Sequence, residues 1–292
     1  MTKSLKTKFI TATLMGAMLL VLCVSGRSQD KLPTKEAIQW KTLDVGLAIA
    51  EIPGPFVSKY SDSKVTVVKI NPDNFDFDLI IATESDTTLR TIKDWCTLKH
   101  LCGAINAGMY SLQDHITAMG YMQNYTFVNN PVVKESFNAL AVFNPKNASL
   151  PSFQIVDMAN EDWKAILENY NCCFQSIRMI DNTGNAIYWS HKPILSCSMC
   201  VLAKDKAGNV LFLFARSPYN ANEFIDFMLG ADLNIQTAMY LEGGPETSIY
   251  VKAADVELCK FGSYVSGSNP DDDNVKLWKL PNILGFHKKM AN

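Results

Sequence analysis

A glutamate followed by two glycines is the clearest candidate for acid–base chemistry in the 292-residue sequence. An apolar run ends at Glu242, Gly243 and Gly244 follow, and a second run begins after Glu246. Glycines permit positive φ and let backbone N–H groups approach an anion such as phosphate. A carboxylate beside such a loop can act as general acid or base. The pattern also fits a tight hairpin with a solvated glutamate, and the residue types leave both interpretations open.

A second candidate lies where a short apolar strand is expected to end, in the segment Gly103–Tyr110. The strand ends in Asn106, and Ala107 and Gly108 then leave the backbone uncovered. An amide side chain beside bare backbone can hydrogen-bond a polar ligand at close range. An asparagine that serves an ordinary turn fits the same pattern equally well.

The cysteines favour buried thiols over a metal or redox motif. Cys197 and Cys200 form a CxxC pair, but positions three apart on a regular strand face opposite sides of a sheet. Binding of one metal ion by both cysteines is therefore disfavoured, and buried thiols that act as small hydrophobic side chains are the favoured interpretation. Setting aside Cys23 in the N-terminal apolar run leaves seven cysteines, and an odd number cannot all pair within one chain. One disulfide, such as Cys96–Cys102, fits an exported protein.

The remaining residue types identify no cofactor. The sequence has 4 His, too few to favour a site built mainly on imidazole, and we assign no metal ligands. Oxygen ligands for a divalent cation such as calcium are not excluded, because the segment Ser263–Asp273 ends in three consecutive aspartates. That segment lacks the alternating ligand spacing of a calcium loop, so a solvated surface loop is the favoured interpretation.

The elements that must position these residues are mostly strands. Runs rich in β-branched and aromatic residues, bounded by Asn, Asp, Gly or Pro, predict strands at 65–70, 77–82, 139–143, 173–180, 186–189, 210–215, 238–242 and 248–251. Helices are expected at 87–101, 161–170 and 222–229. Strands and helices do not alternate regularly. We therefore expect an α+β fold, a single domain with a mixed, largely antiparallel sheet and flanking helices.

The N-terminus predicts export. Three lysines precede an apolar run from Phe9 to Val24, which small residues follow. This is the pattern of a secretory signal peptide, and the run is shorter than the roughly 20 residues of a membrane-spanning helix. We expect a signal peptide at 1–26, a leader at 27–39 and a domain at 40–292. The mature protein would be periplasmic, at the cell surface or secreted, with no membrane span once the signal is removed.

The charge balance excludes one class of partner. The chain has 27 Lys and Arg against 29 Asp and Glu, a net charge of −2, whereas a nucleic-acid binder needs a basic excess. Hydrophobic residues at 48% and charged residues at 19% are typical of a folded chain. Without a broad basic surface, any anion must be recognised locally, by a glycine loop or a single arginine.

Six segments together resemble one family. The segment 106–110 is similar to the "iNaGmF" signature of the phosphodiester glycosidase family, and 241–245 to its "LDGG" signature. Four further segments resemble family motifs in family order: 118–121, 137–139, 174–176 and 280–285. The resemblance covers residues 40–287. It implies a hydrolase of the family's bacterial exported branch, whose substrate is a carbohydrate or glycan carrying a sugar on a phosphodiester.

The resemblance also implies roles for single residues. Glu242 stands where most members have aspartate, as acid, base or electrostatic stabiliser, and the N–H groups of Gly243 and Gly244 would hold phosphate or sugar oxygens. Glu246 is the nearest second acid, and retention and inversion stay open. The residues expected to orient the substrate are Asn106, Gly108, Asn138, Gln175 and Ser176.

One departure from the family pattern concerns phosphate recognition. The family usually has an arginine in the stretch that is Ser196–Cys200 here, and this chain has no basic residue there. Arg178, which would share a strand face with Ser176, or Arg216 could substitute. The missing arginine supports an alternative, a catalytically impaired protein that binds glycan or envelope polymers, and a purely structural domain is a third. His115 receives no catalytic role, although it could line the site.

Overall fold

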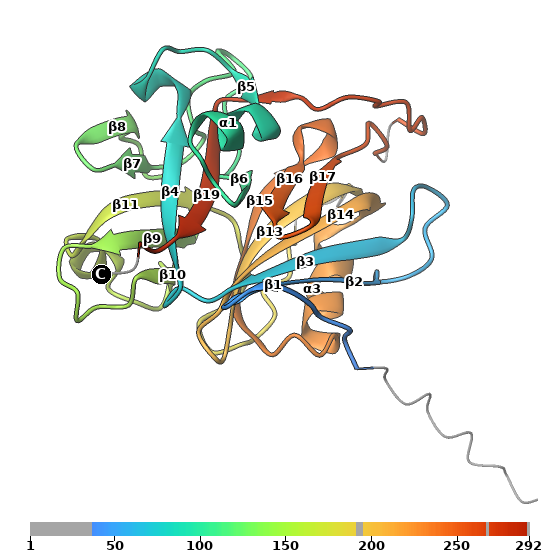
Figure 1. The fold of residues 1–292 in the computed structure, drawn as a ribbon, viewed down its shortest axis with the longest axis horizontal. Helices are drawn as coiled ribbons and strands as arrows, with labels where there is room; N and C mark the ends of the chain where they lie inside the picture. Colours follow the sequence, from blue (N-terminus) through green and yellow to red (C-terminus); the bar gives the residue numbers. More distant parts are fainter. Residues whose placement is uncertain (1–36, 191–194, 267–268, 291–292) are drawn as a thin grey trace, which may run out of the picture. The chain divides into compact units, whose positions relative to one another are not determined.

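Three antiparallel sheets dominate the computed structural model, which describes residues 37–190, 195–266 and 269–290 (Figure 1). The largest sheet contains, in order, β1 (Lys41–Asp44), β2 (Leu47–Pro53), β3 (Lys64–Ile70), β14 (Val210–Tyr219), β13 (Cys197–Asp205), β15 (Ile235–Gly243) and β12 (Arg178–Ile180). The predicted signal peptide and most of the predicted leader lie outside the described residues, and the predicted domain boundaries stay predictions.

The two smaller sheets have five strands each. One has the order β17 (Val256–Phe261), β16 (Ser248–Ala253), β6 (Gly103–Asn106), β19 (Asn282–Lys288) and β4 (Phe75–Ile81). The other has the order β10 (Phe153–Asp157), β9 (Ala139–Pro145), β11 (Tyr170–Ser176), β7 (Met122–Asn124) and β8 (Phe127–Asn130). A two-stranded pair joins β18 (Lys279–Leu280) to β5 (Arg90–Thr91).

Helices are few and short, so the fold is more β-rich than the α+β architecture expected from the sequence. They are α1 (Ile92–Leu98), α2 (Trp163–Leu167) and α3 (Ala221–Gly230), with short 3-10 turns η1 (Ala82–Glu84) and η2 (Gly244–Glu246). The strand pairings within the described ranges are all antiparallel. The predicted largely antiparallel character is therefore confirmed, and the parallel pairs that a mixed sheet would contain are not found among the described strands. Among the described residues, none of the helices has the length and apolar character to cross a membrane.

The predicted helix at 87–101 is too long for a local reason. Arg90 and Thr91 pair with the 279–280 strand, and the Thr91 side chain then caps the helix by accepting from the backbone N–H of Asp94. The helix ends before His100, whose φ of 55° lies in the left-handed region. By contrast, α3 matches its prediction closely, because Asn220 and Glu223 form a reciprocal capping box at its start.

The main core lies among the three sheets. It contains Phe212 and Met239 from the largest sheet, Phe286 from the second and Phe143 and Phe174 from the third, none of them more than 1% exposed. A second cluster packs α3 against the other face of the largest sheet. Burial of one such large apolar side chain stabilises the fold by about 1.5–3 kcal/mol, so this core fixes how the strand ends meet.

Candidate active site

Three strand ends meet at the site, each from a different sheet. The Asn106 side chain, at the end of β6, donates to the carbonyl oxygen of Glu246 at 3.1 Å. A Cβ built on Gly108 would lie 3.6 Å from the carbonyl oxygen of Gln175, near the end of β11. The Tyr240 N–H of β15 donates to the Ile177 carbonyl at 2.9 Å. The structure therefore brings the predicted Asn106, Gln175 and Glu242 segments together.

A β-bulge sets the direction of Glu242. In the β13–β15 pair, Cys200 lies opposite Glu242 and Val201 opposite Tyr240, so Leu241 is an extra residue on β15. Such a bulge breaks the strict alternation of faces and re-aims a side chain. The Glu242 carboxylate accepts the N–H of Gly243 at 3.0 Å. Burial raises the pKa of Glu242 well above its usual value, and the charge of Glu246 raises it further.

Glu246 supplies a second carboxyl group beside Glu242. It ends η2, its side chain is partly buried, and burial raises its pKa while the charge of His115 acts in the opposite direction. The negative charge of Glu246 therefore favours the protonated form of Glu242. Two interacting carboxyl groups with raised pKa values are the groups that general acid–base catalysis requires.

Tyr110 and His115 complete this group from the loop after β6. Tyr110 forms an isolated β-bridge with Ala118 and is 8% exposed, and its ring lies 6.4 Å from the His115 ring. Burial raises the pKa of Tyr110, and the charges of Glu246 and Glu242 raise it further. Sequence reasoning gave Tyr110 no role, although its position four residues after Asn106 could have indicated one.

The glycine N–H groups are already engaged within the protein. Gly244 has the predicted positive φ, 75°, and its N–H and the Tyr240 hydroxyl face the Cys197 thiol, whose pKa burial raises and these two groups lower. The N–H of Gly243 donates to Glu242. A Cβ on Gly243 would lie 2.2 Å from the Tyr240 hydroxyl oxygen, so this glycine is needed for packing. Their contact with a substrate stays a prediction.

The amides of Asn106 and Gln175 hold the site together. Asn106 accepts the Ser248 N–H at 2.7 Å in addition to its bond to Glu246. Gln175 accepts from the N–H groups of Tyr121 and Lys134 and donates to the carbonyls of Lys134 and Phe137. Both side chains are at most 3% exposed. They position the loops around the acids, and their predicted contact with the substrate stays untested.

Ser176 and Arg178 lie on different sheets, so the single strand predicted across 173–180 is wrong. The chain leaves the third sheet at Ser176, passes Ile177 and joins the largest sheet at Arg178, which pairs with Met239. The alternation argument that placed both side chains on one face therefore fails. The Ser176 hydroxyl is buried and has no hydrogen-bond partner within the described residues.

Gly108, which was expected to orient the substrate, has a φ of 84°, in the left-handed region that favours glycine.

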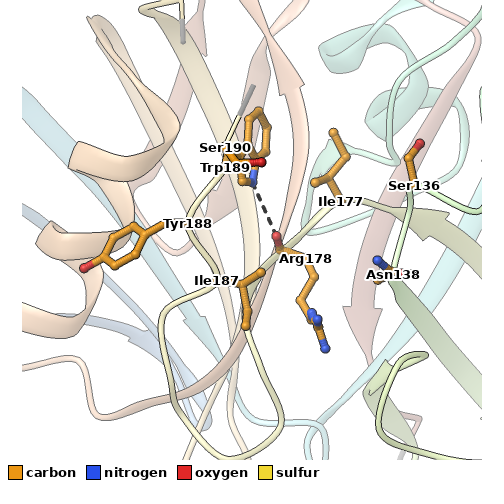
Figure 2. Close-up of a pocket in the computed structure, with 8 residues that line it drawn as sticks. All are labelled: Ser136, Asn138, Ile177, Arg178, Ile187, Tyr188, Trp189 and Ser190. Atoms are coloured by element: carbon orange, nitrogen blue, oxygen red, sulfur yellow. Dashed lines mark hydrogen bonds between the residues drawn. The ribbon is translucent and has the colours of Figure 1, made fainter. Parts of the chain in front are cut away.

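Arg178 lines a pocket of about 470 Å³ with the predicted Asn138 (Figure 2). Its guanidinium is paired with the buried Asp157 carboxylate. The Trp189 indole N–H donates to the Arg178 carbonyl at 3.4 Å, whereas Tyr188 points away from Arg178. The Trp189 ring also lies 5.3 Å from the Tyr240 ring, and Tyr240 is two residues before Glu242. One residue that lines this pocket, Trp189, therefore contacts the strand that carries Glu242.

Arg216 is engaged within the protein, and its substitution for the missing family arginine stays a prediction. Its guanidinium donates to the carbonyls of Phe261, Gly262 and Asn274 and pairs with Asp272 at 2.8 Å. It therefore anchors the segment that sequence reasoning interpreted as a solvated loop. In the described part of the chain, no lysine or arginine is among the charges that act on Glu242 or Glu246.

The seven described cysteines are free thiols, including Cys96 and Cys102, for which a disulfide was considered. Burial raises the pKa of the Cys197 thiol to about 11. The Cys200 thiol points to the Ser248 carbonyl oxygen at 3.5 Å, so the two members of the CxxC pair have different partners. Residues 37–190, 195–266 and 269–290 contain no group of three His, Cys, Asp or Glu side chains arranged to hold a metal.

Comparison with solved structures shows the fold. The structure resembles a hypothetical protein from Synechocystis, with 12% identity and a TM-score of 0.57 over 88% of this chain and 64% of that one. It also resembles the catalytic domain of zebrafish N-acetylglucosamine-1-phosphodiester alpha-N-acetylglucosaminidase, auto-inhibited by its pro-peptide, with 11% identity and a TM-score of 0.53. The overlap covers 87% of this chain and 82% of the zebrafish domain.

Comparison by sequence shows the family. No curated protein matches the chain. The phosphodiester glycosidase family model matches residues 100–287, a range that contains both signature segments and the residues around the acid pair. This match covers more than half of the chain and agrees with the resemblance drawn from six short motifs. The chain therefore belongs to the phosphodiester glycosidase family.

Proposed function

We propose that this protein is an exported glycoside hydrolase that releases a sugar from a phosphodiester-linked, sugar-1-phosphate glycoconjugate. The observation that carries the proposal is the pair Glu242 and Glu246, two interacting carboxyl groups with raised pKa values beside a glycine loop. Membership of the phosphodiester glycosidase family supports hydrolase chemistry at the level of the family. The substrate class and the export are our inferences from that membership and from the N-terminal sequence.

The surroundings of the two acids favour a division of roles. Burial raises the pKa of Glu242 most, the charge of Glu246 adds to this, and the Gly243 N–H opposes them without preventing a large rise, so Glu242 keeps its proton more strongly. Burial also raises the pKa of Glu246, but the charge of His115 lowers it and so favours the carboxylate form of Glu246. Pairs of carboxyl groups with different surroundings divide into acid and base in this way. We therefore assign proton donation to Glu242 and the ionised role to Glu246.

The Arg178 pocket is our candidate for sugar recognition. Its Arg178 and Asn138 side chains can hydrogen-bond sugar hydroxyls. Because Asp157 neutralises Arg178, the pocket suits an uncharged sugar ring better than a phosphate.

The direct test is turnover by Glu242→Gln and Glu246→Gln variants on a sugar-1-phosphodiester. We expect each variant to remain folded and to lose about 100-fold to 10,000-fold in kcat, which is the usual contribution of a general acid or base. Glu135→Gln, which changes an exposed glutamate outside the site, is the matched control and should keep full activity. Unchanged turnover by Glu242→Gln would remove this residue from the mechanism.

A second candidate function is glycan or envelope-polymer binding without turnover. It is favoured by one observation, that no lysine or arginine in the described ranges acts on the acid pair. A panel of phosphodiester-linked sugars separates the two functions when product release and melting temperature are measured together. Ligand-dependent stabilisation without any product would support binding alone, whereas product formation would support the hydrolase.

A further inference from the structure

Tyr110 places a hydroxyl group at the acid pair. The chain runs from Asn106, which is hydrogen-bonded to Glu246, through Gly108 to Tyr110, and the Tyr110–Ala118 bridge holds the loop in place. Tyr110 is 8% exposed, and no hydrogen bond of its hydroxyl to another described residue is present. The hydroxyl oxygen is not among the fully buried polar atoms that lack a partner, so it keeps some exposed surface.

The other neutral donors near the acids face groups of the protein itself. The Gly243 N–H donates to Glu242, and the Gly244 N–H and the Tyr240 hydroxyl face the Cys197 thiol. No lysine or arginine among the described residues acts on either acid. A phosphate oxygen that arrived here would need a donor, because an unpaired anion beside two carboxyl groups is strongly disfavoured.

We propose that the Tyr110 hydroxyl donates a hydrogen bond to a phosphate oxygen of the substrate at the reaction centre. This inference rests on the proposed function and assigns to a neutral group the contact that an arginine would otherwise make. The titratable groups that face Tyr110 are Glu242, Glu246 and His115. Burial and the two glutamate charges raise the pKa of Tyr110, so its hydroxyl stays protonated, and remains a donor, through the neutral range.

The test is Tyr110→Phe, which removes one oxygen and keeps the ring. Its turnover should be compared on a sugar-1-phosphodiester and on a 4-nitrophenyl glycoside of the same sugar, which has no phosphate. We expect kcat/KM on the phosphodiester to fall about tenfold to hundredfold, the usual effect of removing a donor to a charged group, with little change on the aryl glycoside. A purely structural role would reduce both activities together.

Tyr170→Phe is the matched control. Tyr170 is 3% exposed, and its hydroxyl donates to the Pro151 carbonyl at 2.8 Å in the third sheet. It should keep both activities. Binding of the free sugar 1-phosphate to wild type and Tyr110→Phe, measured by calorimetry, provides a readout that does not require turnover, and we expect about tenfold weaker binding by the variant.

The outcomes separate the two proposals. Wild-type turnover that Tyr110→Phe leaves unchanged overturns the role of Tyr110 and keeps the hydrolase. Binding of the sugar 1-phosphate that depends on Tyr110, without turnover by the wild type, supports the contact and overturns hydrolysis. A wild-type protein that neither turns over the phosphodiester nor binds the sugar 1-phosphate overturns both.

Discussion

At the scale of single residues, Glu242 combines two opposing effects. Burial and the charge of Glu246 make its proton hard to remove, which suits a general acid. The same surroundings lower the stability of the folded state whenever the carboxylate ionises. Functional sites commonly carry such a cost, and substitutions that remove it stabilise a protein while they abolish its activity.

The loss of stability caused by ionised Glu242 depends on pH in a definite direction. An unfolded glutamate loses its proton near pH 4.5, whereas folded Glu242 retains it to a higher pH. The free energy of unfolding therefore falls as pH rises from about 4.5 through the raised pKa of the folded state. Glu242→Gln cannot ionise, so we expect it to melt higher than wild type at pH 8 and similarly at pH 4. An equal difference in melting temperature at both pH values would contradict this account.

The buried ion pair between Arg178 and Asp157 leads to a second prediction at the residue scale. The Asp157 side chain is 0% exposed, so Asp157→Asn leaves the guanidinium of Arg178 without its counter-charge. Breaking one side of a buried pair costs about 3–5 kcal/mol, and removing both charges costs much less. We expect urea denaturation to show a large loss of stability for Asp157→Asn and substantial recovery in the double variant with Arg178→Gln. Additive losses would indicate that the pair is not coupled.

At the scale of elements, the position of the η2 turn depends on Gly262, which directly follows β17 and packs against Gly244. A Cβ on Gly262 would lie 1.9 Å from the carbonyl oxygen of Gly244, a contact that only backbone movement can relieve. Gly262→Ala should therefore displace the η2 turn, which carries Glu246. We expect at least a tenfold loss of activity together with a lower melting temperature, because overpacking typically costs 1–3 kcal/mol or more.

Gly230→Ala is the control for that substitution. Gly230 is the last residue of α3, and a Cβ there would have no heavy atom within 4 Å. Replacing a helical glycine with alanine usually stabilises a protein by roughly 0.5–1 kcal/mol. Activity should be unchanged. If the two alanine variants lost the same activity, the contact between Gly262 and Gly244 would not explain the effect.

The elements also show what the sequence could and could not predict. Apolar runs that fill whole strands were found, as at 65–70 for β3 and 248–251 for β16, because burial on a sheet leaves a continuous pattern. The run at 186–189 makes only a bridge through Ala186, and the run at 173–180 divides between two sheets. Periodicity within a run does not indicate which partner strand each half will meet.

The same limit applies to the site. The glycine loop and Asn106 could be located because glycines and a strand-ending amide leave local signals, and Gly244 has its expected positive φ. Tyr110 received no role and Cys197 was interpreted only as a buried thiol, since both residues have their site neighbours more than 40 positions away. A β-bulge such as that at Leu241 leaves no signal in hydrophobic alternation, so the direction of Glu242 could not be predicted either.

At the scale of the whole molecule, stability rests on the core shared by the three sheets. The seven described cysteines are free thiols, and Cys96, Cys172, Cys173 and Cys200 are buried. We therefore expect dithiothreitol to leave the melting temperature unchanged. In the native protein, a thiol reagent should react with few of these groups, and denaturation should expose the rest. A melting temperature that falls under reducing conditions would show that a disulfide contributes.

The Asn106 side chain joins the acid loop to a strand about 140 residues earlier in the chain, through its bonds to Glu246 and Ser248. We expect contacts between such distant positions to form late in folding, because closing a long loop costs entropy before it yields stabilising contacts. The two acids therefore reach their working arrangement only when nearly the whole chain has folded. During refolding, catalytic activity should return with the final kinetic phase, so a nascent or partly folded chain would be inert toward any glycan that it meets.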